Sequence, residues 1–503
     1  MYKNIFFVCI ILLTGLFLRT CDLRKDPFYI SASKAPFVDS GIYTFNAKNK
    51  IIDGSFSFEE YNYHLIFPVH SFISYLIFKS AGIDYFKMIL IYSLLGMCSV
   101  ILFSFADAKK YSLYMLLFLS FSIVFISFNR SGMIENNILL FFALTVMFFS
   151  RKTNISHFAA GLFAVAGILV KSNFVIITGA LICFLIYKFI KTKKIDFSYT
   201  GGLITGSLII CFSIFFFKNY YIQLTDSIIF KQIFADHAAF NTAAFFNPHT
   251  FLHSNFFMRE LPLYALFLAA LYKIILNNNE NDDLTVFMIL IAFFNLLFVN
   301  LSPDYSPLRY RIFMLPVMAI AGLNYFKIRD YSQSRILKFI LIYFFIYPLI
   351  WLISKKLKIN INFSLFNVAV ALSLTLLFFL IAEYLTLFLR PNVFVCIFIL
   401  YAAFQYFSAF SKSGYYLNDI MSDISIQIKP DEKVIGWWAP QLLFNRDDIR
   451  IIPGNPYQKY LDKYNPDYII SPTGAANFKN YKLIKEYNIK TIRYTIYFFK
   501  YNR

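Results

Sequence analysis

Cysteine is scarce in this 503-residue sequence, and its six copies follow no regular spacing. Five lie inside apolar runs, and Cys21 stands just beyond the first run. Neither a disulfide framework nor a C-x-x-C metal site is indicated. The first run, Ile5–Leu18, also lacks a small-residue cleavage site, because Arg19 follows it at once. We therefore expect an uncleaved helix there and not a signal peptide.

The short alternating segments of a β-barrel are missing as well. Long apolar runs take their place, since the chain is 59% hydrophobic and 20% aromatic with a mean hydropathy of +0.60. Such runs, separated by short polar connectors, predict an all-α polytopic membrane protein. The formal charge of +19 is concentrated in the connectors. That placement favours cytoplasmic loops and contact with membrane lipids over nucleic acid as the partner.

Run length and charge bias predict about thirteen membrane-spanning helices. After the first run, the spans fall near residues 86–106, 111–128, 137–150, 156–170, 173–190, 199–217, 259–276, 284–301, 310–326, 336–354, 361–389 and 392–410. Most lysine- and arginine-rich connectors then face the cytoplasm, and the lysines at 355–358 are the main exception. Counting residues 65–80 as a further span would reverse the connectors that follow. We therefore expect an interfacial helix there on the outer surface.

The sequence divides into two expected domains. Residues 1–410 form the transmembrane domain, with outer loops at 19–82 and 218–258. Residues 411–503 form a small α/β domain on the same non-cytoplasmic side, with a polar helix at 457–464. Its expected strands are Val434–Ala439, Ile449–Ile452, Tyr468–Ser471 and Thr491–Phe499. No internal repeat of the transporter kind is evident.

The loop Arg19–Tyr63 carries the motif Val38-Asp39-Ser40-Gly41-Ile42-Tyr43 just outside the first helix. An unpaired charge at a bilayer boundary is costly, so the acid at position 39 indicates a chemical role. The structural alternative is a helix N-cap, for which an Asp in Asp-Ser-Gly is well suited.

Four motifs follow one another in a suggestive order. They are Asp39-Ser40-Gly41-Ile42-Tyr43, Asn129-Arg130-Ser131-Gly132-Met133-Ile134-Glu135, the run Gly161–Lys171, and Arg309-Tyr310-Arg311 with Pro316. This order resembles the GT-C superfamily of polyprenyl-phosphate-sugar-dependent glycosyltransferases, in the style of protein O-mannosyltransferases and lipid A aminoarabinose transferases. The resemblance covers most of the chain. It departs from the family pattern where Val38 and Ser40 flank Asp39, where His64 is separated from Pro68, and where Lys171 precedes serine and not glycine.

The resemblance implies an enzyme of the bacterial inner membrane that moves a sugar from a polyprenyl-phosphate donor to a lipid, glycan or protein acceptor. The active site and the C-terminus would face the non-cytoplasmic side. Asp39 would act as general base in an inverting displacement, and Glu135 would bind the acceptor or a divalent metal, the one candidate cofactor. Cationic side chains would bind the leaving phosphate. The complete predicted substrate-binding set is Tyr43, His64, Arg130, Lys171, Arg309, Tyr310 and Arg311.

Several of these residues have structural alternatives. Glu135 stands at the N-terminus of an expected helix, where an acid is favourable without any function. Arg130 can pair with Glu135, bind phosphate or extend its charge to the membrane boundary. Lys171 can be an ordinary helix-end lysine, and Tyr43 an interfacial aromatic residue.

Two other functions remain open from the sequence. A lipid-linked sugar transporter or flippase would also be polytopic and basic, but it should carry ionisable residues and broken helices within the membrane, which are scarce here. A polyprenyl-linked glycan polymerase or ligase typically has an outer loop rich in arginine and histidine. The loop 218–258 has few arginines. His249 and His253 stand four residues apart within it, as zinc ligands can, but no H-E-x-x-H motif accompanies them.

Overall fold

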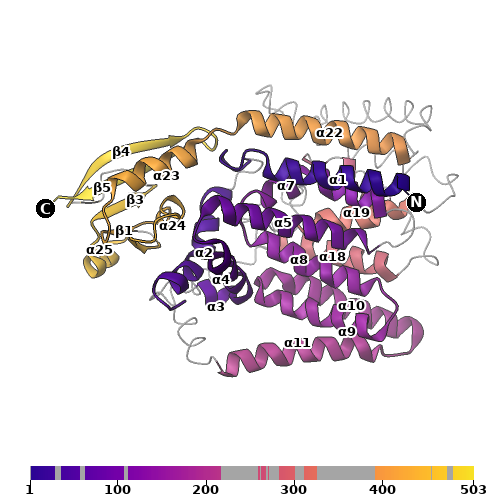
Figure 1. Ribbon diagram of the computed structural model, residues 1–503. Helices are drawn as coiled ribbons and strands as arrows, with labels where there is room; N and C mark the ends of the chain where they lie inside the picture. Colours follow the sequence, from indigo (N-terminus) through magenta and orange to yellow (C-terminus); the bar gives the residue numbers. More distant parts are fainter. Residues whose placement is uncertain are drawn as a thin grey trace, which may run out of the picture.

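Helices make up the larger part of the described chain, and a small mixed sheet follows them. The computed structural model describes residues 2–28, 35–56, 63–106, 112–216, 283–300, 311–325, 391–454, 456–472 and 480–502, with isolated positions in 259–270 and at 478. Figure 1 shows a body of roughly parallel helices with the N-terminus at one end and the sheet at the other.

The helices of the body pack in an ordered series. Helix α5 (Tyr85–Ser104) packs on α8 (Glu135–Phe149), α8 on α9 (Asn154–Ala166), and α9 on α11 (Phe197–Phe216). On another side, α10 (Val175–Thr192) packs on α18 (Asp283–Asn300), and α18 on α19 (Met314–Tyr325). Helices α1 (Tyr2–Thr20) and α22 (Pro391–Lys412) both contact α6 (Ser112–Phe121) and α7 (Ile123–Asn129).

The single span expected over 111–128 is divided into two helices, α6 and α7, which meet at a 62° bend. Ser122 lies at the break and caps α7, accepting a hydrogen bond from Phe125 N at 3.2 Å. Glu260 completes the cap, since its Oε1 accepts from Ser122 Oγ at 2.6 Å and from Val124 N at 3.0 Å. Backbone groups freed by the bend are thus satisfied by side chains, as an apolar environment requires.

Three stretches of the described chain are long and apolar enough to cross a membrane. They are Tyr85–Ser104, Ser172–Thr192 and Phe394–Gln427, and the bent pair α6–α7 makes a fourth if it counts as one span. Six shorter apolar helices of 10–17 residues accompany them. The expected helical architecture with apolar spans is confirmed, whereas the total of about thirteen stays a prediction.

The segment 19–63 was expected to lie in an outer loop, and the structure shows that it carries a helix. It contains the 18-residue helix α2 (Ala35–Ile52), followed by the short α3 (Tyr63–Ile66) and by α4 (Pro68–Ala81). Helix α2 escapes a hydropathy analysis because its second half, with Asn46, Lys48 and Asn49, is polar. Packing on α4 and on the C-terminal region holds it instead. The interfacial position of residues 65–80 stays a prediction.

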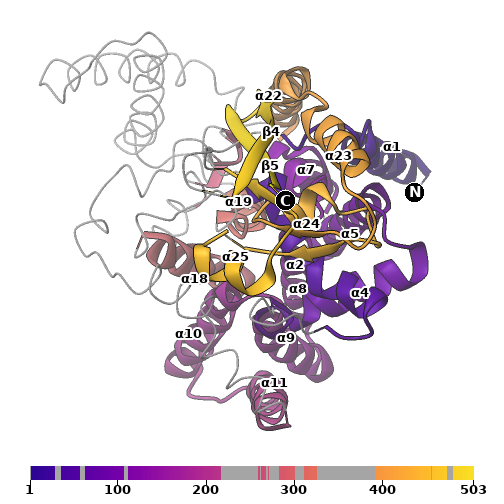
Figure 2. The same cartoon turned by 90° about the vertical axis from the view of Figure 1, so that its left-hand side faces the viewer.

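The C-terminal sheet has the strand order β2-β1-β3-β5-β4. Strand β1 (Lys433–Ile435) pairs in parallel with β2 (Arg450–Ile452) and β3 (Tyr468–Ser471), while β5 (Tyr494–Tyr501) runs antiparallel to β3 and to β4 (Tyr481–Ile489). Helices α23 (Tyr416–Gln427), α24 (Ala439–Leu442) and α25 (Gln458–Tyr464) accompany the strands. Figure 2, which views the molecule from the sheet end, shows the strands in front of α2 and α5.

The expected mixed α/β character of this region is confirmed, and the four expected strands correspond to β1, β2, β3 and β5. The sequence analysis missed β4, because most of its residues are exposed or half-buried and its apolar alternation is weak. The division at residues 410/411 stays a prediction. Trp438 is 2% exposed and stacks on Tyr494, so it belongs to the core of this region.

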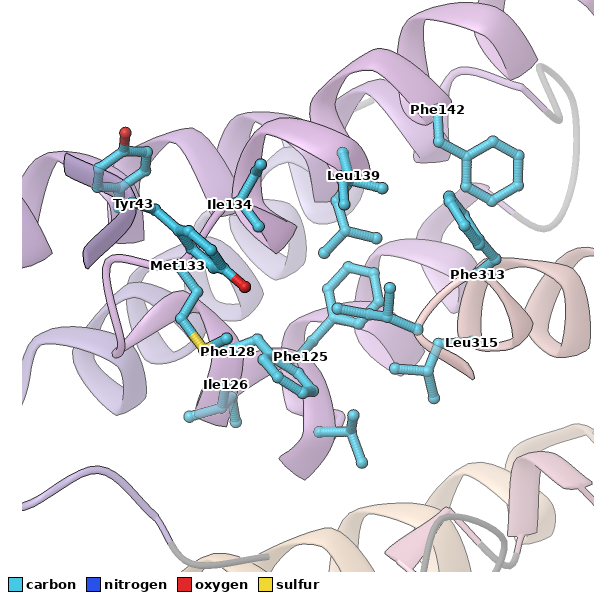
Figure 3. Packing of buried hydrophobic residues seen from close by; sticks show 14 of the residues in the cluster. Tyr43, Phe125, Ile126, Phe128, Met133, Ile134, Leu139, Phe142, Phe313 and Leu315 are labelled. Carbon is cyan, nitrogen blue, oxygen red and sulfur yellow. The ribbon is translucent and has the colours of Figure 1, made fainter. Parts of the chain in front are cut away.

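A dense aromatic core lies beneath the candidate site. Phe142 of α8 packs edge-on against Phe313, with ring centroids 5.6 Å apart, and Phe313 packs in the same way on Phe174 at 5.9 Å. Figure 3 shows Phe142 and Phe313 facing each other beside Leu139. This packing fixes the N-terminal part of α8 and the segment before α10 relative to each other, which is where the predicted acid and lysine lie.

Candidate active site

Several described segments that carry predicted residues meet at the sheet end of the helical body. The end of α1 contacts Arg130, in the link between α7 and α8. The start of α5 contacts the C-terminal region, because Tyr85 N donates to Asn445 Oδ1 at 2.8 Å. Helix α2 packs on α24 at the same end. Residues from opposite ends of the sequence therefore meet in one zone.

Asp39 lies in the second turn of α2 and is 8% exposed. It is inside the helix, so the alternative role of N-cap is wrong. Tyr43, one turn later, donates its hydroxyl hydrogen to Asp39 Oδ2 at 3.2 Å. The two predicted residues share one face of the helix through their i, i+4 spacing. The tyrosine hydroxyl can therefore orient the carboxylate.

His70 of α4 connects the Asp39 face to α8, although the sequence analysis gave it no role. Its ring lies edge-on to Tyr43 at 6.3 Å, and its Nδ1 accepts a hydrogen bond from Asn137 Nδ2 at 2.8 Å. Burial, with a smaller effect of the nearby Lys171 charge, lowers the pKa of His70 to about 3, so its ring is neutral at pH 7. The available signal was the run of polar residues His70, Ser71 and Ser74 in a mainly apolar helix.

Glu135 and Lys171 form a buried ion pair, with Lys171 Nζ 2.7 Å from Glu135 Oε1. Their side chains are 0% and 6% exposed. Glu135 is the first residue of α8, where the helix dipole stabilises its charge, and Lys171 immediately precedes the 3-10 turn η2 (Ser172–Phe174). The structure thus brings together two predicted residues that are 36 positions apart in the sequence.

Glu135 itself and two residues near the pair have buried polar atoms without a hydrogen-bond partner among the described residues. The atoms are Glu135 Oε2, His70 Nε2 and both side-chain amide atoms of Asn173. Such atoms are uncommon in folded proteins because each one costs free energy when it is removed from water. The zone around the Glu135–Lys171 pair is therefore suited to a polar ligand that can both donate and accept hydrogen bonds.

Arg130 has a different setting from the one expected. Its guanidinium donates to the carbonyl oxygens of Leu18, Arg19, Cys21 and Asp22, at 2.6–3.4 Å, and lies over the Phe28 ring. A cation at the C-terminal end of α1 satisfies carbonyls that have no partner within the helix. Its position is thus explained without a ligand, and no pairing with Glu135 is needed.

Of the predicted motif Arg309-Tyr310-Arg311, the structure describes Arg311. Arg309 and Tyr310 lie outside the described residues, as does the histidine-bearing loop 218–258. Arg311 is fully buried three residues before α19 begins, and it is followed by Phe313, which packs against α8 and η2.

His64 lies in α3, which packs on α2. Its ring stacks on Phe56 at 5.8 Å, and its backbone N donates to Asn46 Oδ1 at 3.3 Å. Burial lowers the pKa of His64 to about 4, so it is neutral at pH 7. His64 therefore supports the α2 side of the zone.

A divalent metal fits this zone poorly. Among the described residues, no group of three or more His, Cys, Asp or Glu side chains is placed to hold a metal ion. Glu135 already has an ammonium group on one oxygen, and a second cation there would be repelled. The described residues of this zone offer carboxylate, hydroxyl, neutral imidazole, amide and ammonium groups for chemistry.

The comparisons with known proteins concern the fold. No family model matches the chain, and no curated protein matches it significantly by sequence. The structure of ArnT from Cupriavidus metallidurans bound to undecaprenyl phosphate matches over nearly the full length of both chains. The TM-score is 0.60 with 12% identity, covering 99% of this chain and 98% of ArnT. The chain therefore has the fold of ArnT, which confirms the expected GT-C resemblance at the level of the fold.

Proposed function

We propose that this protein is a membrane glycosyltransferase that transfers a sugar from a polyprenyl-phosphate donor to a lipid, glycan or protein acceptor. The observation that carries the proposal is the full-length likeness to ArnT, a protein solved with undecaprenyl phosphate bound. The buried acid and ion pair at one end of the helical body agree with this likeness. The reaction would take place on the non-cytoplasmic face of the inner membrane.

In the proposed reaction, an acceptor hydroxyl oxygen attacks the anomeric carbon from the side opposite the phosphate. The bond between that carbon and the phosphate oxygen breaks, polyprenyl phosphate leaves, and the configuration inverts. Asp39 takes the hydroxyl proton, with its carboxylate oriented by Tyr43. The barrier arises from charge that develops on the sugar and on the phosphate, so fixed charges near both lower it.

Lys171 would supply positive charge to the departing phosphate, and Arg309 and Arg311 would be further cations for it. Glu135 would position the lysine ammonium group through its contact of 2.7 Å. Its second oxygen, with the neutral His70 and the Asn173 amide, would bind hydroxyl groups of sugar or acceptor. These roles require the groups to face one common cavity.

The test is mass spectrometry of envelope lipids and glycans from a deletion strain complemented with wild type, Asp39→Asn or Asp53→Asn. Asp53 lies just beyond the end of α2 and is exposed, so it serves as the matched control. We expect Asp39→Asn to reduce the product about 10²–10⁴-fold and Asp53→Asn to restore it fully. Full restoration by Asp39→Asn would exclude Asp39 as the base.

A second function, transport of a lipid-linked sugar, is favoured by the 62° break between α6 and α7. Against it, the break has its own cap in Glu260. The two functions separate in detergent solution, where there are no membrane sides. Purified protein mixed with an envelope extract of the deletion strain should form a new glycosidic bond if it is a transferase. A transporter would leave the extract unchanged.

A further inference from the structure

The helix that carries Asp39 is held by a residue some 400 positions further along the chain. Gln441 of α24 is fully buried, and its Oε1 accepts two hydrogen bonds. Ser40 Oγ donates to it at 2.7 Å, and Gly41 N donates at 2.9 Å. One side-chain oxygen of the C-terminal region thus binds the two residues that directly follow Asp39.

Gly41 shows how closely α24 approaches this turn. A Cβ atom placed on Gly41 would lie 2.6 Å from both N and Cα of Gln441 and 2.7 Å from the carbonyl carbon of Pro440. All three are backbone atoms, so no rotamer change could relieve the contact. Glycine at position 41 is therefore explained by contact between the two helices, and this contact sets the distance between them.

Lys48 forms a second anchor about two turns after Gly41. It is 3% exposed, and its Nζ donates to the carbonyl oxygens of Leu443 at 3.0 Å, Phe444 at 2.9 Å and Arg446 at 2.5 Å. Three ammonium hydrogens meet three backbone acceptors, which is the full donor capacity of lysine. Residues 441–446 therefore bind α2 at both the Asp39 turn and the turn of Lys48.

A third contact fixes the chain before α2. Asp26 is 1% exposed and accepts hydrogen bonds from Leu417 N and from Thr491 Oγ1, both at 2.8 Å. Leu417 is the second residue of α23, and Thr491 lies in the turn between β4 and β5. The segments on both sides of Asp39 are thus attached to the same C-terminal region.

We propose that Gln441 is a positioning residue for Asp39, so that the C-terminal region forms part of the catalytic apparatus. A catalytic group must be held to within about 0.5 Å of its productive position by supporting contacts. The two hydrogen bonds of Gln441 fix the position of the helical turn that carries Asp39, and Lys48 prevents α2 from sliding along α24. This inference rests on the proposed function, because it needs Asp39 to act as the base.

The first test measures product formation by purified protein in a detergent extract of deletion-strain envelopes, which supplies donor and acceptor. We expect Gln441→Ala to lower the maximal rate about 10–100-fold without changing the extract concentration that gives half the maximal rate. Ser40→Ala removes one of the two hydrogen bonds and should lower the rate about 3–10-fold. Gln458→Ala is the control, because Gln458 is an exposed glutamine of the same region that binds only the nearby Asp462.

A double-mutant cycle separates positioning from general stability. Asp39→Glu displaces the carboxylate by one methylene group, so Gln441→Ala should cost little in that background. A merely structural role of Gln441 would give the same loss in both backgrounds. Additive losses, or a wild-type rate for both Gln441→Ala and Ser40→Ala, would overturn the inference.

Hydrogen exchange tests the same contact without any substrate. In Gln441→Ala, the amides of residues 39–43 should exchange faster, while those of α8 keep the wild-type rate. Unchanged exchange at 39–43 overturns the inference even if activity falls. If Asp39→Asn is fully active, the proposed base fails. If Asp39→Asn is inactive while Gln441→Ala works at the wild-type rate, only the positioning role fails.

Discussion

Buried cations contact both ends of the link Asn129–Glu135, but they have different partners at each end. At its first end, Arg19 and Arg130 donate to backbone carbonyls and to the Asn129 side chain. At its other end, Lys171 binds the carboxylate of Glu135. The arginines are thus held by neutral dipoles that belong to the fold, whereas the lysine is held by a second charge.

This difference leads us to expect a structural role for the two arginines and a chemical role for the lysine. Backbone carbonyls at a helix end need donors whether or not the protein has a ligand, so the two arginines are fully explained by folding. A buried ion pair is seldom the most stable use of the same space, because desolvation of two charges offsets their attraction. The Glu135–Lys171 pair, with an additional unpartnered carboxylate oxygen, therefore calls for a functional explanation.

Removal of Lys171 should have the largest effect on stability. Lys171→Met leaves the Glu135 carboxylate buried and without its cation, which costs about 3–5 kcal/mol of unfolding free energy. The double variant Glu135→Gln/Lys171→Met should recover most of this loss but form no product. Unfolding of the detergent-solubilised protein, with product analysis, checks both expectations.

The control is Lys188→Met, because Lys188 pairs with Asp196 at 3.1 Å in a partly exposed position. That change should cost about 0–1 kcal/mol. If the double Glu135–Lys171 variant were both stable and fully active, the ion pair would have no role in the reaction. The lysine would then be a structural cation like the two arginines.

Arg130→Met should have a smaller effect on stability and none on turnover. It frees the carbonyls at the end of α1 and should cost about 1–3 kcal/mol. Because its contacts are with backbone, product formed per folded molecule should stay at the wild-type level. Arg151→Met, at an exposed position, should change neither quantity. A loss of turnover with Arg130→Met would restore the substrate-binding role predicted from the sequence.

Gly132→Ala tests whether the conformation of the link Asn129–Glu135 positions Glu135. Gly132 has a φ of +54°, and an added Cβ would lie 2.6 Å from the end of the flexible Met88 side chain. The left-handed conformation alone should cost about 1–2 kcal/mol. Gly54→Ala, at a φ of +72° with open space around it, isolates that cost. A loss of turnover that occurs only in Gly132→Ala would show that the link positions Glu135.

Local signals made the helical class predictable, and they selected Asp39, Glu135 and Lys171 as candidate site residues. Apolar runs fix the helices of a membrane protein because the bilayer leaves few alternatives. The mixed sheet was visible because β1, β2 and β3 are buried and rich in isoleucine.

What the sequence could not reveal depends on contacts between distant segments. Helix α2 is held by its packing on α4 and α24. Its sequence alone, with a polar second half, resembles that of a loop. The partners of Arg130 are backbone atoms, which no residue pattern encodes. Gln441 gave no signal either, because a single glutamine in a soluble region is ordinary until its contact with Ser40 is known. His70 was overlooked for the same reason.

Asp26 adds a buried anion to the comparison and should give the smallest effect. Unlike Glu135, it is satisfied by neutral donors, Leu417 N and Thr491 Oγ1. Burial raises the pKa of Asp26 above the ordinary value of 3.8. Its contribution to stability is therefore fully present below pH 3.8 and is lost as the pH rises through the raised pKa.

Asp26→Asn removes this titration while keeping an oxygen for Leu417 N, and the change at low pH should be below about 1 kcal/mol. The melting temperature of the variant relative to wild type should rise as the pH increases from about 4 to about 7. Asp462→Asn, at an exposed position of α25, is the control. A difference that stays constant with pH would mean that Asp26 is ionised at no cost. Neutral donors would then hold a buried anion as well as Lys171 does, and charge pairing would no longer mark the functional site.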